Sequence, residues 1–310
     1  MLIYFAANPA DWDTYRPLLT DALDAAGIDA QLTDAPENPQ AVDYIVYAPD
    51  GPLSDFTPFS RAKAVLSLWA GVEKIVGNDT LTQPLCRMVD PGLRQGMTEW
   101  VTGHVLRHHL GLDTHILHQD GVWRGGTVPP LAASRPVGIL GLGALGSAAA
   151  EALASLGFPV QGWSRSDKAL PNVACHTGAD GLDTVLATSD ILVLLLPQTP
   201  ATRHILNARS IARLPKGAVI LNPGRGPLID DDALIAALRA GHVGHATLDV
   251  FAIEPLPADH PYWSLQNVTV TPHIASATRP ETAAPAVIEN ILRCEAGEPL
   301  LHRVDREQGY

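Results

Sequence analysis

Residues 137–146 read VGILGLGALG, and this stretch decides the fold. A short apolar run leads into three glycines spaced as G-x-G-x-x-G, and an alanine-rich, helix-forming segment follows. The first glycine permits a tight turn, the second lets the backbone approach a pyrophosphate, and the third lets the helix pack on the strand. A dinucleotide site is predicted here, although a strand–helix turn without a ligand has the same composition. The binding positions expected in this loop are Gly141, Gly143, Ala144, Leu145 and Gly146.

The same region also has the length of a membrane span. Residues 137–160 are almost all apolar, and about 20 such residues suffice to cross a bilayer. Five glycines, two serines and Glu151 nevertheless fall inside this stretch. An unpaired carboxylate costs ~2.5–3.5 kcal/mol at the bilayer centre even on the most lenient scale. We therefore expect no membrane segment here.

Short runs rich in valine, isoleucine and leucine recur further along the chain, and helical patterns lie between most of them. Strands of this series are expected at 137–140, 160–163, 191–196, 218–221, 246–250 and 268–271. Continuous apolar strands separated by helices indicate a parallel sheet with both faces covered. The first hundred residues show a smaller alternation of the same kind. The predicted fold class is therefore α/β, with a Rossmann-type doubly wound parallel sheet and a smaller, flavodoxin-like α/β unit.

The residues after the second strand of this series indicate which dinucleotide binds. An acidic residue about 20 positions beyond the glycine loop would accept a bond from the 2′-hydroxyl of NAD. Here the chain has Ser164, Arg165 and Ser166 instead, with Lys168 nearby. Guanidinium and hydroxyl donors suit a 2′-phosphate, which a carboxylate would repel. We expect NADP(H) in preference to NAD(H); the alternative is a surface arginine that merely follows a strand.

Three polar side chains follow successive strands of the same series. Arg225 stands between two glycines, Glu254 precedes a proline, and His273 follows one. Ligands of doubly wound sheets bind outside the carboxyl ends of the strands, so these groups should converge. Arginine can hold a carboxylate, histidine exchanges a proton near neutral pH, and a carboxylate on the far imidazole nitrogen favours the imidazolium form. Together they predict reduction of a 2-oxo acid, although each side chain alone also has a structural explanation.

The composition of the chain indicates which classes of binding partner and which cellular compartment to expect. The 310 residues include 21 Lys and Arg against 33 Asp and Glu, and a net charge of −12 disfavours a nucleic-acid-binding surface. Hydrophobic residues, at 46%, provide for a sizeable core. The three cysteines are widely spaced and include no CxxC pair, which indicates neither a disulfide framework nor a metal site. The first residues lack the basic region of a signal peptide, so we expect a cytoplasmic protein.

Histidines gather in a helix that the pattern places at 98–118. They are His104, His108, His109, His115 and His118. His104 and His108 are four positions apart and could share a metal ion, but no carboxylate ligand or HExxH pattern accompanies them. We expect a solvated or interface face of the helix and no metal. Trp123, which follows this helix, is expected to pack in the core or at a hinge.

The motifs together resemble the D-isomer-specific 2-hydroxyacid dehydrogenase family, and within it the bacterial glyoxylate/hydroxypyruvate reductase A type. The segments that carry this resemblance are GLGALG at 141–146, GWSR at 162–165, LPQTP at 196–200, NPGRG at 222–226, DVFAIEP at 249–255 and TPHIA at 271–275. Further likeness at WAGVEK (69–74), MTEW (97–100) and VDR (304–306) extends it over almost the whole chain.

The resemblance implies an NAD(P)-dependent enzyme whose cofactor domain is inserted into a substrate domain built from both ends of the chain. The substrate domain is expected at 1–97 and 281–310, and the NADP-binding Rossmann domain at 98–280. Arg225 matches the substrate-binding arginine of the family, Glu254 the acid that orients the histidine, and His273 the general acid–base. The family also implies a cleft between the domains and a homodimer formed through the cofactor domains.

Further site positions follow from the same resemblance. The loop expected to hold the substrate carboxylate comprises Trp69, Ala70, Gly71 and Val72. Additional cofactor contacts are expected at Pro197, Gln198, Thr199, Asp249 and His273. The predicted reaction is reduction of a small 2-oxo acid, such as glyoxylate or hydroxypyruvate, to the D-(R)-2-hydroxy acid, with the histidine as general acid.

The chain departs from the family pattern beside the expected pocket. Trp69 stands where this type has a small residue, Glu73 replaces an aspartate, and Pro223-Gly224 replace a bulkier residue and an alanine. These changes leave the preferred 2-oxo acid open. One alternative is a dehydrogenase for a different or phosphorylated 2-hydroxy acid, and another is a regulator that senses a dinucleotide without catalysis. The intact arginine, glutamate and histidine argue against the regulator.

Overall fold

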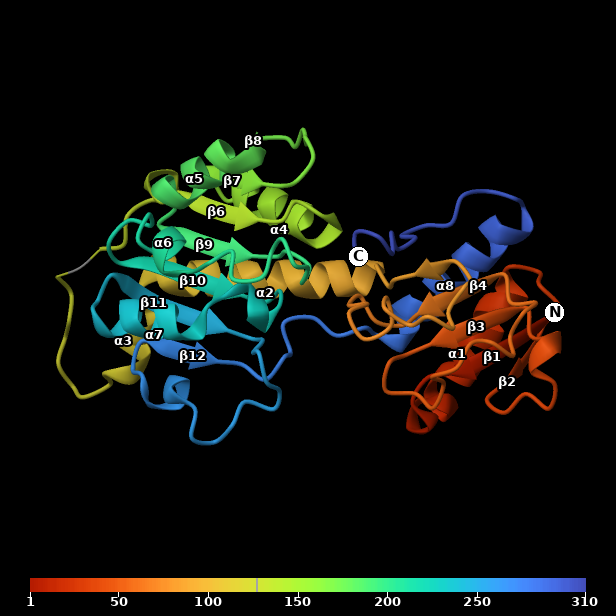
Figure 1. Cartoon of the computed structure of the whole chain (residues 1–310). Helices are drawn as coiled ribbons and strands as arrows, with labels where there is room; N and C mark the ends of the chain where they lie inside the picture. Colours follow the sequence, from red (N-terminus) through yellow and green to blue (C-terminus); the bar gives the residue numbers. More distant parts are fainter. Residues whose placement is uncertain (127) are drawn as a thin grey trace. The chain divides into compact units, whose positions relative to one another are not determined.

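The computed structural model describes residues 1–126 and 128–310, which form two compact units (Figure 1). Unit 1 comprises Met1–Leu93 and Thr278–Tyr310, and unit 2 comprises Arg94–Ala277. The chain thus leaves unit 1, builds unit 2 and then returns to complete unit 1. The two crossings lie a few residues before the positions expected from the sequence.

Unit 1 is built on a five-stranded parallel sheet with the order β2-β1-β3-β4-β5. This is the order of flavodoxin-like doubly wound sheets. Its strands are β1 (Leu2–Ala6), β2 (Gln31–Thr33), β3 (Tyr44–Tyr47), β4 (Ala64–Ser67) and β5 (Leu85–Cys86). Helices α1 (Trp12–Ala25) and α8 (Pro280–Glu295) pack together, and both contribute to the core on one face of this sheet. Because α8 follows the second crossing, its packing makes the C-terminal segment part of unit 1.

Unit 2 contains a seven-stranded parallel sheet with the order β12-β11-β10-β9-β6-β7-β8. Its strands are β6 (Val137–Leu140), β7 (Val160–Trp163), β8 (Val173–His176), β9 (Ile191–Leu194), β10 (Ala218–Asn222), β11 (Val243–Leu248) and β12 (Val268–Val270). Counted from β6, this is the 3-2-1-4-5-6 order of the Rossmann fold with one further strand. The predicted Rossmann-type sheet is confirmed. The strand order reverses between β6 and β9, which pair from Val137–Ile191 to Leu140–Leu194.

Helices cover both faces of the unit 2 sheet and explain its apolar strands. They are α2 (Pro91–Leu110), α3 (Leu112–Leu117), α4 (Ala144–Ser155), α5 (Gly178–Thr188), α6 (Ala208–Ile211) and α7 (Asp231–Arg239). Along β9, Leu192 and Leu194 belong to one core cluster, whereas Ile191 and Val193 belong to the other. A strand buried on both faces loses the apolar–polar alternation, as the sequence indicated.

One segment differs from the sequence expectation, and a second follows it. The helix expected without interruption over 98–118 breaks at Gly111, whose φ of +63° separates α2 from α3. The apolar stretch at 137–160 divides into β6, α4 and the first residue of β7. Over the residues that the structure describes, no helix combines the length and the apolar character needed to cross a membrane.

Candidate functional site

The loops after β10, β11 and β12 hold the three side chains that the sequence singled out. These strands are parallel neighbours, so their carboxyl ends meet at one edge of the sheet. The main chain joins the loops directly, because Asp249 N–H donates to Asn222 O (3.0 Å) and His273 N–H donates to Asp249 O (2.8 Å). The structure therefore brings the arginine, glutamate and histidine loops together within unit 2.

The loop that carries Arg225 is shaped by the residue at the end of β10. Asn222 Oδ1 accepts from the Gly224 amide at 3.2 Å, and Asn222 Nδ2 donates to the Arg225 carbonyl at 3.0 Å. A Cβ atom on Gly226 would lie 1.9 Å from the carbonyl carbon of Phe251, so the loop packs backbone to backbone against the one after β11. Arg225 Nη1 donates to the Gly224 carbonyl at 2.7 Å, which fixes the guanidinium against its own loop.

His273 and Glu254 form a hydrogen-bonded pair. His273 Nδ1 lies 2.8 Å from Glu254 Oε2, and the other carboxylate oxygen accepts from the Phe251 amide at 2.9 Å. The histidine side chain is 50% exposed. Since the carboxylate holds Nδ1, the nitrogen available to a ligand is Nε2. His273 also has a backbone φ of +55°, a left-handed conformation that costs a non-glycine residue about 1–3 kcal/mol.

Asp249, expected to contact a cofactor, is 0% exposed and serves the chain itself. Its carboxylate accepts from the Thr271 hydroxyl at 2.5 Å, the Ile274 amide at 2.9 Å and the Ala275 amide at 2.9 Å. These donors lie on both sides of His273 in the sequence. The buried carboxylate thus ties the loop after β12 to the end of β11, and a contact with a cofactor stays a prediction.

The glycine loop after β6 has the shape that a pyrophosphate requires. Gly141 has a φ of +108°, and a Cβ atom there would lie 2.4 Å from Leu195 O. A Cβ atom on Gly146 would lie 1.8 Å from Gly141 O, so only glycine lets α4 approach the turn this closely. Gly143, by contrast, is the N-cap residue of α4, and a Cβ atom added there would have no other atom within 4 Å. The open side of the loop therefore lies at the positive N-terminus of α4, which suits a dinucleotide phosphate.

The segment after β7 presents a basic group beside this loop. Gly141 N–H donates to the Trp163 carbonyl at 2.8 Å, which joins the end of β7 to the glycine turn. Ser164 is buried, and its hydroxyl donates to the Ser166 carbonyl at 2.7 Å. Arg165 and Lys168 are exposed. The turn thus places two exposed cationic side chains after β7, as a 2′-phosphate site requires.

The segment after β9 forms a turn around one hydroxyl group. Thr202 Oγ1 donates to the Pro197 carbonyl at 2.7 Å and accepts from the Thr199 amide at 2.9 Å. Thr199 and Gln198 are half-buried. Because β9 lies next to β6 at the reversal of strand order, this turn follows the strand that borders the glycine loop.

The loop expected to hold a substrate carboxylate lies in unit 1, directly after β4. Ser67 Oγ accepts from the Trp69 amide at 3.1 Å and fixes the start of the loop. The Trp69 side chain is 37% exposed, and the ammonium of Lys74 lies 5.5 Å from its ring centroid. Val72 is buried and its carbonyl accepts from the Ile75 amide at 3.0 Å. Ala70 and Gly71 are half-buried between these anchors.

The sequence predicts a solvated or interface face for the histidines of α2, and the structure does not show a solvated face. His109 is buried, and His108 Nε2 lies 2.9 Å from the Thr247 hydroxyl of β11. His108, Asp113 and His245 bring ligand-type atoms within 4.8 Å of one another. Arg107, however, binds both oxygens of Asp113 at 2.6 and 2.9 Å. The carboxylate of this cluster is therefore already paired with a cation of the same chain.

Sequence reasoning missed the polar residues that shape the loops. Asn222, Thr202 and Thr271 each bond the backbone or a side chain of a neighbouring loop residue and so fix the segment around a candidate site residue. The available signal was their place at or just beyond the end of an apolar strand. That signal does not tell a residue that shapes a loop from one that binds a ligand.

Comparison with known sequences agrees with the geometry described above. Residues 103–275 match the family described as D-isomer specific 2-hydroxyacid dehydrogenase, NAD binding domain. A protein of Serratia proteamaculans named glyoxylate/hydroxypyruvate reductase A is 37% identical over 311 residues, covering 96% of this chain and 98% of that protein. A protein of the same name from Yersinia enterocolitica is 40% identical over 80% of this chain and 82% of that protein.

Solved structures give the same result. A D-isomer specific 2-hydroxyacid dehydrogenase from Xanthobacter autotrophicus, in complex with NADPH and MES, is 44% identical with a TM-score of 0.90. That match covers 100% of this chain and 99% of the other. An NADPH-dependent glyoxylate/hydroxypyruvate reductase from Sinorhizobium meliloti, in complex with NADP and sulfate, is 35% identical with a TM-score of 0.83, over 100% and 99% of the two chains.

Proposed function

The chain belongs to the D-isomer specific 2-hydroxyacid dehydrogenase family, and we propose that it uses NADPH to reduce a small 2-oxo acid to the D-2-hydroxy acid. The observation that carries the proposal is the 2.8 Å bond between His273 Nδ1 and Glu254 Oε2. It orients a half-exposed imidazole at the carboxyl edge of a Rossmann sheet, where a proton donor is needed. Relatives named for glyoxylate and hydroxypyruvate point to the substrate class.

His273 is the proton donor of the proposed reaction. NADPH held at the glycine loop would supply the hydride for the carbonyl carbon. The imidazolium gives its Nε2 proton to the carbonyl oxygen as the alcohol forms, and water restores that proton afterwards. Glu254 holds Nδ1 and balances the positive charge of the protonated ring, which keeps the ring in one orientation.

Arg225 and the loop after β4 are the proposed carboxylate binders. A guanidinium can bond a carboxylate with two parallel N–H groups and polarise the neighbouring carbonyl. The bonds of Asn222 and Gly224 around Arg225 hold it at the end of β10. In unit 1 we assign the backbone of Ala70, Gly71 and Val72 to the substrate carboxylate, with the half-exposed Trp69 beside it.

The cofactor proposal rests on the shape of the glycine loop and on the charge after β7. The open position at Gly143 and the N-terminus of α4 receive the pyrophosphate. Arg165 and Lys168, together with Ser166, receive the 2′-phosphate of NADPH. Structures of family relatives that contain NADPH or NADP support the same preference. NADH has no 2′-phosphate for Arg165 and Lys168 to bind.

We expect Arg165→Ala to raise the KM for NADPH about 10- to 150-fold and to change that for NADH less than twofold. A charge-assisted bond contributes about 1.5–3 kcal/mol, and only NADPH has the phosphate that would lose it. The test follows NADPH and NADH oxidation with glyoxylate and hydroxypyruvate, using Arg209→Ala, an exposed arginine on α6, as the control. If the KM rises equally for NADPH and NADH, Arg165 does not determine the choice between the two cofactors. A wild type that reduces no small 2-oxo acid refutes the proposed function itself.

A homodimer is part of the same proposal, and the segment at 110–131 supports it. The exposed large apolar side chains of this segment are Leu110, Leu112, Ile116, Leu117, Val122, Trp123, Val128 and Leu131. They make up 8 of the 15 found over the described chain. Trp123, expected in the core or at a hinge, is instead 95% exposed. Exposed apolar side chains this close together in the sequence support an interface with a second copy of the chain.

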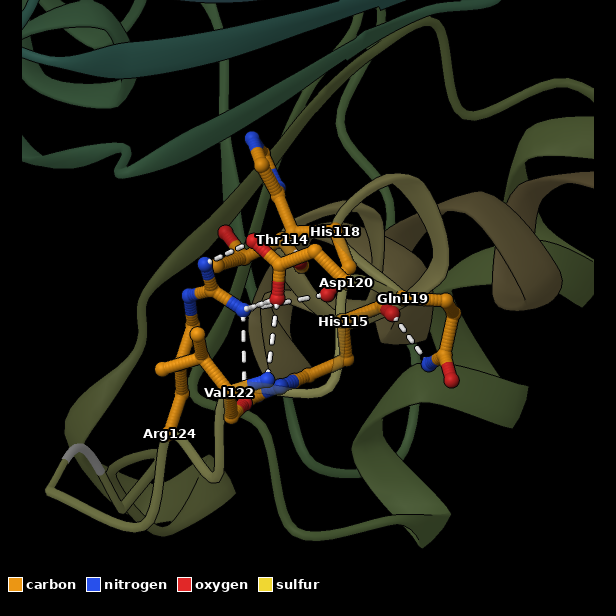
Figure 2. Close-up of polar contacts among 7 residues, drawn as sticks. All are labelled: Thr114, His115, His118, Gln119, Asp120, Val122 and Arg124. Carbon is orange, nitrogen blue, oxygen red and sulfur yellow. Dashed lines mark hydrogen bonds and ion pairs between the residues drawn. The ribbon is translucent and has the colours of Figure 1, made fainter.

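Polar contacts give residues 114–124 of this segment a defined shape. Arg124 binds both carboxylate oxygens of Asp120 at 2.6 Å, and the Val122 amide donates to the same carboxylate (Figure 2). The bonds from Arg124 and Val122 lower the pKa of Asp120 to about 2. His118 adds a bond from its Nδ1 to the Thr114 carbonyl at 2.8 Å. A segment ordered by its own polar groups can present its apolar side chains to a second copy with little loss of entropy.

The double substitution Leu117→Ser and Trp123→Ser should convert the dimer to monomers at micromolar concentration. Both side chains are exposed in the single chain, so their loss removes interface area without disturbing the core. Sedimentation equilibrium gives the mass, with Leu156→Ser, an exposed leucine at the end of α4, as the control. A monomeric wild type, or a double variant that stays dimeric, contradicts the assignment.

The state of the thiols supports a cytoplasmic location as the remaining part of the proposal. Cys86, Cys175 and Cys294 are free cysteines. Burial raises the pKa of the Cys86 thiol to about 11, which keeps it unreactive. Free thiols are the state that a reducing compartment maintains.

A further inference from the structure

The proposed proton donor has a backbone conformation that its own side chain does not favour. His273 has a φ of +55°, in the left-handed region that few residues with a Cβ atom adopt. Such a conformation persists where the surrounding contacts overdetermine it, and it is common at functional sites. The contacts that fix it here should therefore determine where the imidazole points.

Asp249 supplies those contacts from the end of β11. Its carbonyl oxygen accepts from the His273 amide at 2.8 Å. Its carboxylate accepts from the Thr271 hydroxyl before the histidine and from the Ile274 and Ala275 amides after it. Asp249 thus forms hydrogen bonds with His273 itself and with residues on both sides of it in the chain.

Burying the Asp249 carboxylate has a cost in free energy. The Asp249 side chain is 0% exposed, and its donors are one hydroxyl and two amides, all of them neutral. Hydrogen bonds from neutral groups offset only part of the cost of removing a carboxylate from water. Two backbone amides that converge with a hydroxyl need an acceptor with several lone pairs, which a carboxylate provides and an amide side chain does not.

We infer that Asp249 and Thr271 are positioning residues that hold His273 in its left-handed conformation, so that its imidazole meets Glu254. This inference rests on the proposed function, because it assigns the means by which the proton donor is aimed. Without the carboxylate, the segment from Thr271 to Ala275 relaxes toward an ordinary φ, and the ring turns away from Glu254 Oε2.

The test compares Thr271→Val, Thr271→Ser and Asp249→Asn with the wild type. Valine has the shape of threonine without the hydroxyl, so we expect a kcat about 10-fold lower. Asparagine cannot accept all three bonds, and a misplacement of about 1 Å costs up to about 100-fold in kcat. Thr271→Ser restores the hydroxyl and should lie within about twofold of wild type. Thr184→Val, the same change on the exposed face of α5, is the matched control.

Two further readouts separate positioning from a general structural effect. The Kd for NADPH, measured by fluorescence, should change less than twofold in Thr271→Val. In ligand-free protein labelled with 15N-histidine, the His273 Nδ1–H resonance should shift away from its Glu254-bonded position in Thr271→Val and return in Thr271→Ser.

Each outcome is decisive. If Asp249→Asn weakens NADPH more than 10-fold while Thr271→Val is normal in kcat and in its histidine spectrum, Asp249 is a cofactor contact and the inference fails. Variants that all match the wild type overturn it as well. If Asp249→Asn does not fold, the comparison of Thr271→Val with Thr271→Ser still tests the inference. A wild type without reductase activity defeats the proposed function, whereas the histidine spectrum still tests the positioning.

Discussion

Replacing His273 with asparagine should lower kcat for 2-oxo acid reduction about 10³-fold and leave the Kd for NADPH within about twofold. General acid catalysis by a positioned side chain contributes about 10²–10⁴-fold, and asparagine has no proton to give. Asparagine also tolerates a positive φ, so the +55° backbone at this position is kept. The loss then reports the missing proton rather than a distorted loop. Steady-state assays with saturating NADPH measure it.

A second variant provides the control for this prediction. Reduction consumes one proton, and His273→Asn removes the group that is proposed to supply it. Glu254→Gln replaces the carboxylate that holds Nδ1 at 2.8 Å, so kcat should also fall, by a smaller factor than in His273→Asn. A His273→Asn enzyme within about threefold of wild type, or a Glu254→Gln enzyme with the wild-type kcat, would contradict the assigned roles.

Features that follow a local sequence pattern could be predicted from the sequence alone. The glycine spacing at 141–146 predicts a strand–turn–helix, which the structure shows as β6 and α4. The apolar runs predict the parallel strands, because strands buried on both faces need apolar residues throughout. The arginine, glutamate and histidine were located because each follows a strand, and parallel strands bring such positions to one edge.

The remainder depends on contacts between residues far apart in the chain. β2 and β5 have only three and two residues, too few to show a period, and are defined by the strands they pair with. The Asp249 carboxylate bonds residues 22 to 26 positions away, and the sequence alone does not reveal these bonds. Trp123 is expected in the core or at a hinge because it is large and apolar, yet it is 95% exposed, and composition alone does not reveal burial.

The histidines of α2 are a further case, since the residues that face them come from other elements. The rings of His108 and His245 on β11 have centroids 4.7 Å apart. Burial, followed by the charges of His245 and Arg107, lowers the pKa of His108 to about 3. Burial, Arg107 and His104 lower the pKa of His245 to about 4, while Asp113 acts in the opposite direction. Both rings are therefore neutral in the folded protein at pH 7.

These lowered pKa values predict that unit 2 is sensitive to acid. An unfolded histidine has a pKa of about 6.5, so below that pH the unfolded chain binds more protons than the folded one. The stability due to neutral His108 and His245 is therefore complete above about pH 6.5 and is lost as the pH falls from there to about 4 for His245 and to about 3 for His108. For His245 alone, a lowering from 6.5 to about 4 corresponds to about 3 kcal/mol.

We expect His245→Gln to reduce the loss of unfolding free energy between pH 7 and pH 4 by about 2–3 kcal/mol relative to wild type. Glutamine does not titrate, and its presence also removes a positive charge that would oppose the protonation of His108. Urea unfolding at several pH values measures the difference. Protonation of the carboxylates affects both proteins and cancels in the comparison. His115→Gln, at an exposed position of α3, should follow the wild-type curve. If His245→Gln loses as much stability as wild type over this range, the buried imidazoles are not the acid-sensitive groups of the fold.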